Sequence, residues 1–342
     1  MYQQCDFCVM DSTAKEFVKT ETGCNFCEQA LKSLEEIKKD KLPEIKGKVL
    51  IGLSGGVDSS MVLHHAVKMG LDVTAYTVDT GYNNPKSDAN ILKMVEKLKV
   101  PFYRYTIDLD KFHELQSAFL KAGVINAEIP TDHILMASIY EMADKYGIAT
   151  ILSGGNVESE SVMPPRWSYN ARDLVHIKDI YKKMTGKRLK GLPLCSLLRL
   201  NYYWHIKGIK IIYLLDHLGY NRSEAIKLLE KEYGFETTGD KHEDNEFTKW
   251  FQNFYLYNKF GIDKRKAHYS SLICSGQMTR DDALERIRED LWYPKFGIEQ
   301  KVMDYPKHAH EEYKQDKWYN RIAKLWKYWE TLQHRLQKHF QK

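Results

Sequence analysis

Short apolar runs alternate with helix-forming stretches through the first half of the chain. Val49 to Leu53 is an apolar run bounded by glycine, which is typical of a buried parallel strand. Similar runs recur at residues 73–78, 102–107 and 149–153, and helical patterns separate them at residues 58–69, 86–99 and 131–146. Strands that alternate with helices predict an α/β fold with a parallel, doubly wound sheet. Because such sheets bind ligands at the carboxyl ends of their strands, we expect functional residues there.

The pattern divides the chain into three regions. Residues 1–44 contain four of the six cysteines and a charged helical stretch at residues 28–41, so we expect a small metal-binding unit and a linker helix. Residues 45–195 form the expected α/β domain. Strand signals fade after about residue 195, and residues 196–342 are expected to be mainly helical, contributing to a substrate site and to partner docking.

The composition indicates an ordinary soluble globular protein. Of the 342 residues, 43% are hydrophobic and 28% are charged, which argues against disorder and against a fibrous class. The net charge of +5 permits anionic partners such as nucleotides, but it is too small to indicate nucleic acid. No apolar run is long enough for a membrane helix, and the N-terminus lacks a signal pattern, so we expect a cytoplasmic protein.

A glycine-rich turn, Ser54-Gly55-Gly56-Val57-Asp58-Ser59, joins the first expected strand to its helix. Backbone N–H groups can converge on an anion only where side chains do not block the approach, and Gly55 and Gly56 remove that obstacle. The positive end of the helix also favours phosphate, while Asp58 can hold the loop or help to place Mg²⁺. Hydroxyl donors come from Ser54, Ser59 and Ser60. We therefore predict that this loop binds the pyrophosphate of ATP.

Two other interpretations of the turn are weaker. The glycines of a tight turn can simply permit its geometry, but the Ser-Gly-Gly-x-Asp-Ser pattern after a buried strand favours phosphate binding. A Walker-type phosphate loop is disfavoured, because Gly186-Lys187 is followed by Arg188 rather than by serine or threonine.

The N-terminal cysteines have the spacing of a metal site. Cys5-x2-Cys8 is followed after 15 residues by Cys24-x2-Cys27, and two such knuckles can present four thiolates to one ion. We expect structural Zn²⁺ in a zinc-ribbon-like unit, although an iron–sulfur cluster uses the same ligands. Cys195 and Cys274 stand alone and are interpreted as core residues.

The glycine-rich turn resembles that of the PP-loop ATP pyrophosphatases, which cleave ATP between the α and β phosphates and transfer AMP to an oxygen of the substrate. The resemblance implies a Rossmann-like fold in which the end of the second strand, here Val78 and Asp79, meets the adenosine. A later turn resembles the family's second nucleotide-contacting turn and comprises Ser153, Gly154, Gly155 and Asn156. An ordinary loop is the alternative for this second turn.

Other segments resemble the N-acetyl sugar amidotransferase family. They are residues 5–11, 152–156, 239–243, 259–265 and 270–280, and they span most of residues 5–285. The resemblance implies conversion of the acetamido group of a nucleotide-linked bacterial sugar into an acetamidino group, in surface-polysaccharide (lipopolysaccharide or O-antigen) or nonulosonic-acid synthesis. The acetamido oxygen would attack the α-phosphorus of Mg-ATP, and ammonia would then displace AMP.

That chemistry indicates candidate side chains in these segments. Lys264 and Arg265 are candidates for neutralising phosphate charge, although a solvated basic turn is the alternative. His242 could move a proton from ammonium, and Glu243 could position the acetamido group, but a histidine in a polar turn is usually just exposed.

Two further pairs are ambiguous. Arg166 and Trp167 could grip a diphosphate and stack on a sugar or base, or they could belong to a rigid surface loop. Asp132 and His133 lie at the start of an expected helix and are interpreted as its cap.

The source of ammonia is expected to be a separate subunit. Position 2 is Tyr2 rather than the cysteine of an N-terminal-nucleophile glutaminase, and no cysteine lies in a Gly-x-Cys-x-Gly turn. We therefore predict a glutaminase partner. The aromatic and basic segment from Trp318 to Phe340, with Trp326 and Trp329, could dock that partner or pack on its own domain.

Two alternative functions use the same loop. A tRNA-modifying PP-loop enzyme would install sulfur or an amine, but it would be expected to have paired cysteines near the loop and a basic stripe. A non-catalytic nucleotide sensor would not need polar turns at several strand ends.

Overall fold

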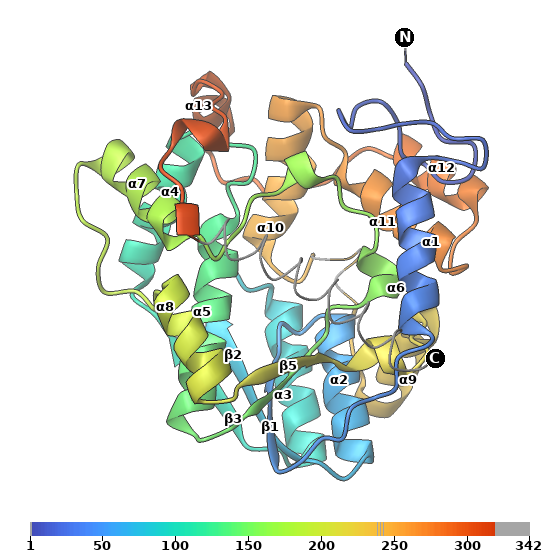
Figure 1. The fold of residues 1–342 in the computed structure, drawn as a ribbon, viewed down its shortest axis with the longest axis vertical. Coiled ribbons are helices and arrows are strands. Elements are labelled where there is room, and N and C mark those ends of the chain that lie inside the picture. Colours follow the sequence, from blue (N-terminus) through green and yellow to red (C-terminus); the bar gives the residue numbers. More distant parts are fainter. Residues whose placement is uncertain (1, 238, 240, 242, 319–342) are drawn as a thin grey trace, which may run out of the picture.

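A five-stranded parallel sheet forms the centre of the molecule (Figure 1). The computed structural model describes residues 2–237, 239, 241 and 243–318. The strand order is β3-β2-β1-β4-β5, and every neighbouring pair is parallel. The strands are β1 (Lys48–Gly52), β2 (Asp72–Asp79), β3 (Phe102–Thr106), β4 (Thr150–Ser153) and β5 (Lys210–Tyr213). The predicted doubly wound α/β fold is confirmed, and the strand order reverses between β1 and β4.

Helices cover both faces of the sheet. Successive side chains of a strand point to opposite faces, so Val49 and Ile51 of β1 pack in one core while Leu50 packs in another. The first core includes α2 (Val57–Lys68), α3 (Pro85–Leu98) and α9 (Arg222–Tyr233). The second includes α4 (Leu109–Lys121), α5 (Ile129–Lys145) and α7 (Leu174–Thr185). These two layers hold the strand ends, and the loops that follow them, in fixed positions.

A helical layer lies beyond the carboxyl ends of the strands and above the sheet in Figure 1. It comprises α10 (Glu246–Trp250), its π-helical continuation (Phe251–Lys259), α11 (Lys264–Cys274), α12 (Arg280–Arg288) and α13 (Glu299–Asp304). The buried ammonium of Lys259 donates to the carbonyls of Val302 and Tyr305 at 2.8 and 2.6 Å. Because a buried cation needs such acceptors, this contact fixes the end of the π-helix just before α11.

The remaining helices and helical turns complete the described chain. They are α1 (Asn25–Ile37), α6 (Val157–Glu160), a 3-10 turn (Pro165–Trp167), α8 (Leu197–Asn201), a π-helical turn (Tyr202–Ile206), and 3-10 turns at Leu214–His217 and His310–Glu312. No helix in this part of the chain is sufficiently long and apolar to span a membrane.

Two expectations about these elements were wrong. The sheet continues past residue 195, where the α/β domain was expected to end, because β5 pairs with β4. With only four residues and one buried side chain, β5 gives too short an apolar run to be recognised. The linker helix, expected to reach residue 41, ends at Ile37, because the lysine- and aspartate-rich segment that follows has no apolar residue to pack. Trp326, Trp329 and Phe340 lie outside the described residues.

Candidate active site

The glycine-rich turn wraps the N-terminus of α2. Gly56 is the N-cap residue, and Gly55 has a φ of +79°, a conformation that favours glycine. A Cβ atom on Gly55 would lie 2.2 Å from the carbonyl oxygen of Ser87 in α3. The backbone of this turn therefore passes α3 at a distance that only glycine allows.

The second glycine turn meets the first across the point where the strand order reverses. A Cβ atom on Gly154 would lie 3.0 Å from the backbone nitrogen of Ser59. The hydroxyls of Ser54 and Ser59 lie 3.2 Å apart, and the Gly56 N–H donates to the Ser54 hydroxyl at 3.3 Å. Backbone N–H groups and hydroxyls thus converge at a helix N-terminus, as an anion site requires.

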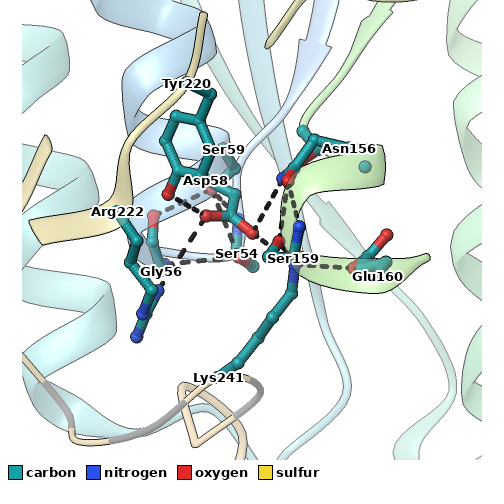
Figure 2. Close-up of polar contacts among 12 residues, drawn as sticks. Ser54, Gly56, Asp58, Ser59, Asn156, Ser159, Glu160, Tyr220, Arg222 and Lys241 are labelled. Carbon is teal, nitrogen blue, oxygen red and sulfur yellow. Dashed lines mark hydrogen bonds and ion pairs between the residues drawn. The ribbon is translucent and has the colours of Figure 1, made fainter. Parts of the chain in front are cut away.

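Asp58 is the centre of a charged network (Figure 2). One of its carboxylate oxygens lies 2.7 Å from the Lys241 ammonium, and the other lies 3.9 Å from the Arg222 guanidinium and accepts from the Tyr220 hydroxyl. Lys241 also lies 2.8 Å from a carboxylate oxygen of Glu160. Five side chains from distant segments are therefore brought together beside the glycine turns.

The charges of this network reinforce one another. Burial alone would raise the pKa of Asp58, but Lys241 and Arg222 hold it below its usual value. Burial alone would lower the pKa of Lys241, but Asp58 and Glu160 raise it. Asp58 is therefore ionised and Lys241 protonated at neutral pH, so that anionic and cationic groups stand together at the loop.

Three adjoining cavities surround the loop. The phosphate cavity, about 220 Å³, is lined by Ser54, Asp58, Gly154 and Lys241 among others. The strand-end cavity, about 600 Å³, lies against the carboxyl ends of β1, β2 and β4. The C-terminal cavity, about 670 Å³, is lined mainly by residues of α9, α11 and the segment after α12.

Shared residues connect these cavities. The phosphate cavity shares Ser54, Gly154 and Asp244 with the strand-end cavity. It shares Arg222, Gly239 and Lys241 with the C-terminal cavity. A group at the phosphate loop is therefore next to both of the larger spaces.

The strand-end cavity has an apolar end and a polar end. An apolar wall against the sheet suits a planar base. It is formed by Val78, Leu135, Ile139, Ile151 and Leu152. The polar end includes Glu128, Asp132 and Lys264. Burial raises the pKa values of both carboxyl groups and lowers the pKa of Lys264 to about 8.

The four N-terminal cysteines form a compact, buried quartet. Cys5 and Cys27 sulfurs lie 3.8 Å apart, those of Cys8 and Cys24 lie 3.7 Å apart, and all four fall within 4.8 Å of one another. Four sulfurs at about 2.3 Å from one tetrahedral ion would be separated by about 3.8 Å. The Cys8 and Cys24 N–H groups donate to the Cys5 and Cys27 sulfurs, which supports thiolate character. The quartet can therefore hold a metal ion.

Hydrogen bonds join this quartet to α11 and α12. Arg280 donates to the carbonyls of Cys8 and Cys5 at 3.1 and 3.0 Å, and the Val9 N–H donates to Ser270 at 3.2 Å. Segments 5–11 and 270–280, which the resemblance linked in the sequence, thus contact each other. A metal in the quartet would support the helices that line the C-terminal cavity.

Two protein-family models match the chain in the regions just described. One, described as NAD synthase, matches residues 30–193 and covers the glycine turns and the first four strands. The other, described as the C-terminal domain of WbpG-like LPS biosynthesis proteins, matches residues 244–296, which include α10, α11 and α12. The chain belongs to the PP-loop ATP pyrophosphatase family. ATP use follows from this membership, and the WbpG-like domain accounts for much of the wall of the C-terminal cavity and a smaller part of the wall of the strand-end cavity.

More distant relatives match parts of this PP-loop protein. A probable tRNA sulfurtransferase from Acholeplasma laidlawii (strain PG-8A) is 25% identical over an alignment of 171 positions, which covers 43% of this chain and 40% of that protein. The match thus spans less than half the length of that curated relative.

Two solved structures are also similar. A predicted subunit of tRNA methyltransferase from Methanocaldococcus jannaschii DSM gives a TM-score of 0.31 at 17% identity, covering 54% of this chain and 75% of that one. The U34-tRNA thiolase NcsA from Methanococcus maripaludis, with its [4Fe-4S] cluster, gives a TM-score of 0.36 at 14% identity. That similarity covers 89% of this chain and 97% of the thiolase chain.

Most of the nucleotide residues expected from the sequence lie together around the PP-loop. Gly155 lines the phosphate cavity, and the Asn156 amide donates to Asp58 at 3.4 Å. Ser60 is buried inside α2 and lines none of the three cavities. Asp79 also stays outside them, because its carboxylate accepts from the Gly81 N–H and lies 3.7 Å from Arg104.

The expected substrate residues are more scattered. Trp167 is buried in the wall of the strand-end cavity, and Glu243 lines the C-terminal cavity, where it pairs with Lys249 at 2.6 Å. Arg166 is directed toward Glu16 of the N-terminal unit instead. His242 lies outside the described residues.

The remaining candidates, Lys264 and Arg265 of α11 and His133 of α5, have different environments. Lys264 lines both larger cavities. Arg265 lines only the C-terminal cavity, where its guanidinium pairs with Asp263 and donates to carbonyls at the end of α12. His133 accepts from the Cys195 N–H and is bonded to the Ala171 carbonyl, while burial lowers its pKa to about 4.

Sequence reasoning missed the cations that face the PP-loop. Lys241 lies in the 239–243 segment, where the predicted site residues were its neighbours His242 and Glu243. Arg222 begins α9, far along the chain, and only the fold brings it to the loop. The position of Lys241 in the 239–243 segment, which resembles the amidotransferase family, was the signal available for it.

Proposed function

We propose that this protein is an AMP-forming amidotransferase that converts the acetamido group of a nucleotide-linked N-acetyl sugar into an acetamidino group. The observation that supports it best is the junction of two parts. A PP-loop with its charged network opens into the C-terminal cavity, whose wall comes largely from residues 244–296, the WbpG-like domain, and into the strand-end cavity, to which the same residues contribute a smaller part. Ammonia would be the nitrogen donor, and AMP and pyrophosphate would be the other products.

ATP fits the first two cavities. Its β and γ phosphates would occupy the phosphate cavity, against the N-terminus of α2, with Lys241 and Arg222 as counter-charges. Its adenosine would lie on the apolar end of the strand-end cavity, near Val78. Asp58 and Glu160 have the oxygen ligands that Mg²⁺ prefers, and the ion would neutralise charge on the phosphates.

The sugar substrate would approach from the side of the WbpG-like domain. The C-terminal cavity offers Lys249 beneath the exposed ring of Trp292, with the ammonium 4.5 Å from the ring centroid. An aromatic face beside cations suits a base and a diphosphate. The acetamido group would then reach the α-phosphorus where Ser54, Gly154 and Asp244 join the cavities.

Positioning and charge neutralisation are the main tasks of such a site. The acetamido oxygen bonds to the α-phosphorus and pyrophosphate leaves, giving an adenylated imidate. Ammonia then bonds to the imidate carbon, and the bond from that carbon to the AMP oxygen breaks. The first step needs an in-line approach and cations on the departing phosphates, which Lys241 and Arg222 can provide.

The test is product formation from a panel of nucleotide-linked N-acetyl sugars with Mg-ATP and ammonium. We expect one sugar of the panel to stimulate AMP release and to become lighter by about 1 Da, since NH replaces O. We also expect glutamine to replace ammonium only when a separate glutaminase subunit is added. AMP release without a changed sugar would contradict the proposal, and equal activity with glutamine alone would contradict the partner.

A tRNA-modifying activity is the second candidate, because part of the chain matches a probable tRNA sulfurtransferase. Cys195 and Cys274 are both buried, and neither lines the cavities around the PP-loop. No cysteine of the described chain is therefore placed to carry sulfur to an adenylated base. Specific retention of tRNA, together with AMP formation that depends on it, would favour this candidate instead.

We further propose that the cysteine quartet holds one structural Zn²⁺. A cluster of four irons would separate the four thiolates further than one ion does, and the sulfur spacing matches one ion. We expect one zinc per chain and no visible absorption. Cys24→Ser should lower the thermal unfolding midpoint and release zinc, whereas Cys195→Ser should leave the zinc content unchanged. Iron, sulfide and visible absorption in the purified protein would contradict zinc.

A further inference from the structure

The polar end of the strand-end cavity combines three titratable side chains that ATP binding does not explain. Glu128 and Asp132 lie four residues apart at the start of α5, and Lys264, the first residue of α11, lines the same cavity. Residues four apart on a helix lie on the same face, so both carboxylates face the cavity. Asp132 is exposed, and the space to which it is exposed is this cavity.

These carboxylates are not neutralised by direct ion pairs within the described part of the chain. Glu128 accepts from the Thr248 hydroxyl, and the carboxylate of Asp132 has neither a hydrogen bond nor an ion pair there. The Lys264 ammonium is 2.9 Å from the Met163 sulfur, and no ion pair joins it to either carboxylate. Two carboxylates therefore face an open space with one cation nearby but not in contact.

Such an arrangement favours a small cation or a group that becomes cationic. Two neighbouring carboxylates repel each other unless a positive group meets them, and the partial burial of Glu128 and the charge of Asp244 increase this cost. Lys264 offsets part of this charge while opposing a doubly charged metal ion. The acetamido substrate is neutral, but the acetamidino product is a planar cation with paired N–H donors, which match a carboxylate as a guanidinium does.

We propose that Glu128 and Asp132 bind ammonium and receive the protons that it loses as the carbon–nitrogen bond forms. This inference rests on the proposed amidotransferase function. Ammonium gives one proton to a carboxylate and becomes ammonia, whose lone pair bonds to the imidate carbon. The new nitrogen gives up a second proton, the carbon–oxygen bond breaks, and AMP leaves with the oxygen. Two protons thus leave ammonium for each amidinium formed. Asp132 can accept one directly, and Glu128, whose pKa burial raises to about 8, can accept the other once the bound cation favours its ionised form.

The position of the pair supports this role. The strand-end cavity joins the phosphate cavity at Ser54, Gly154 and Asp244, so a reacting group there can be reached from the polar end. Burial raises the pKa values of Glu128 and Asp132 above those of ordinary carboxyl groups, which makes the carboxylates better proton acceptors. The groups facing Glu128 include Asp132, Asp244 and Lys264.

The experiment compares two nucleophiles in the full-length protein with its sugar substrate. Ammonium must lose a proton before it attacks, whereas hydroxylamine is already unprotonated at neutral pH and would form an amidoxime. For Asp132→Asn and Glu128→Gln we expect kcat/KM for ammonium to fall by about 100-fold and that for hydroxylamine to fall by less than about tenfold, because hydroxylamine has one proton fewer to lose. Glu141→Gln is the control, because Glu141 lies on the same helix but bonds to Tyr105 outside the cavity.

Any other outcome would overturn the inference. Equal losses with both nucleophiles would place the two carboxylates in adenylation or in folding, and no loss with either would remove them from the reaction. Thermal unfolding of each variant separates misfolding from these cases. If the unaltered protein changes no sugar with either nucleophile, the amidotransferase function itself fails. If the unaltered protein does change the sugar, and the variants do not discriminate between the nucleophiles, only the proposed ammonium site is wrong.

Discussion

Lys241→Met is expected to lower kcat/KM for AMP formation by about 100- to 1,000-fold, because it removes a cation placed beside the departing phosphates. The ammonium lies 2.7 Å from Asp58 and 2.8 Å from Glu160, and only 9% of the side chain is exposed. If Mg²⁺ were held by Asp58 and Glu160, the Lys241 ammonium would be available to neutralise phosphate oxygens. Steady-state AMP release with saturating sugar substrate measures the effect.

Stability provides a control for this substitution. Loss of Lys241 leaves the more distant Arg222 as the cation beside Asp58. Breaking a buried ion pair typically costs about 3–5 kcal/mol. Lys241→Arg keeps the charge, so it should recover much of the stability and part of the rate. Lys187→Met removes an exposed cation paired with Glu114 and should change neither. A full rate in a folded Lys241→Met protein would show that this cation is not used.

Gly55→Ala is expected to abolish ATP binding and to destabilise the fold by more than the cost of its backbone conformation. A non-glycine residue at positive φ costs about 1–3 kcal/mol. At Gly55 the new Cβ would also lie 2.2 Å from the backbone oxygen of Ser87, so α3 or the PP-loop must move. Movement of the loop would disperse the N–H groups that face the phosphates. Calorimetric titration with Mg-ATP and thermal unfolding would measure the two effects.

Gly70→Ala measures the free-energy cost of placing alanine at a positive φ, without a steric clash. Gly70 has a φ of +74°, close to that of Gly55, but a Cβ there would meet no atom within 4 Å. We expect Gly70→Ala to lower stability modestly and to bind ATP normally. Similar ATP affinity in Gly55→Ala and Gly70→Ala would mean that the close approach to α3 does not shape the phosphate site.

The core of the fold could be predicted from the sequence because its strands are continuous apolar runs. β1, β2 and β4 are buried on both faces, and such segments remain recognisable without their neighbours. β5 is short and lies at the sheet edge, where half-exposed residues are tolerated, so its pattern is weak. Packing against β4, rather than local sequence, decides its conformation.

The PP-loop could be predicted for a similar reason, since its function depends on consecutive residues. Its counter-charges could not, because Lys241 and Arg222 reach Asp58 only through folding of segments more than 150 residues away. The carboxylates of Glu128 and Asp132 show the same limit. In the sequence Asp132 indicated a helix cap, but Glu128 holds the N-cap position and Asp132 faces a cavity. The catalytic and substrate roles assigned to individual residues remain predictions.

The most direct test of acetamido adenylation follows the oxygen atom. The sugar that responds in the product assay would be prepared with a heavy oxygen isotope in its acetamido group and incubated with Mg-ATP and ammonium. We predict that mass spectrometry will find the heavy oxygen in AMP and not in the sugar, because the carbon–oxygen bond breaks when ammonia enters. Heavy oxygen retained by the sugar, with unlabelled AMP, would contradict the proposed mechanism.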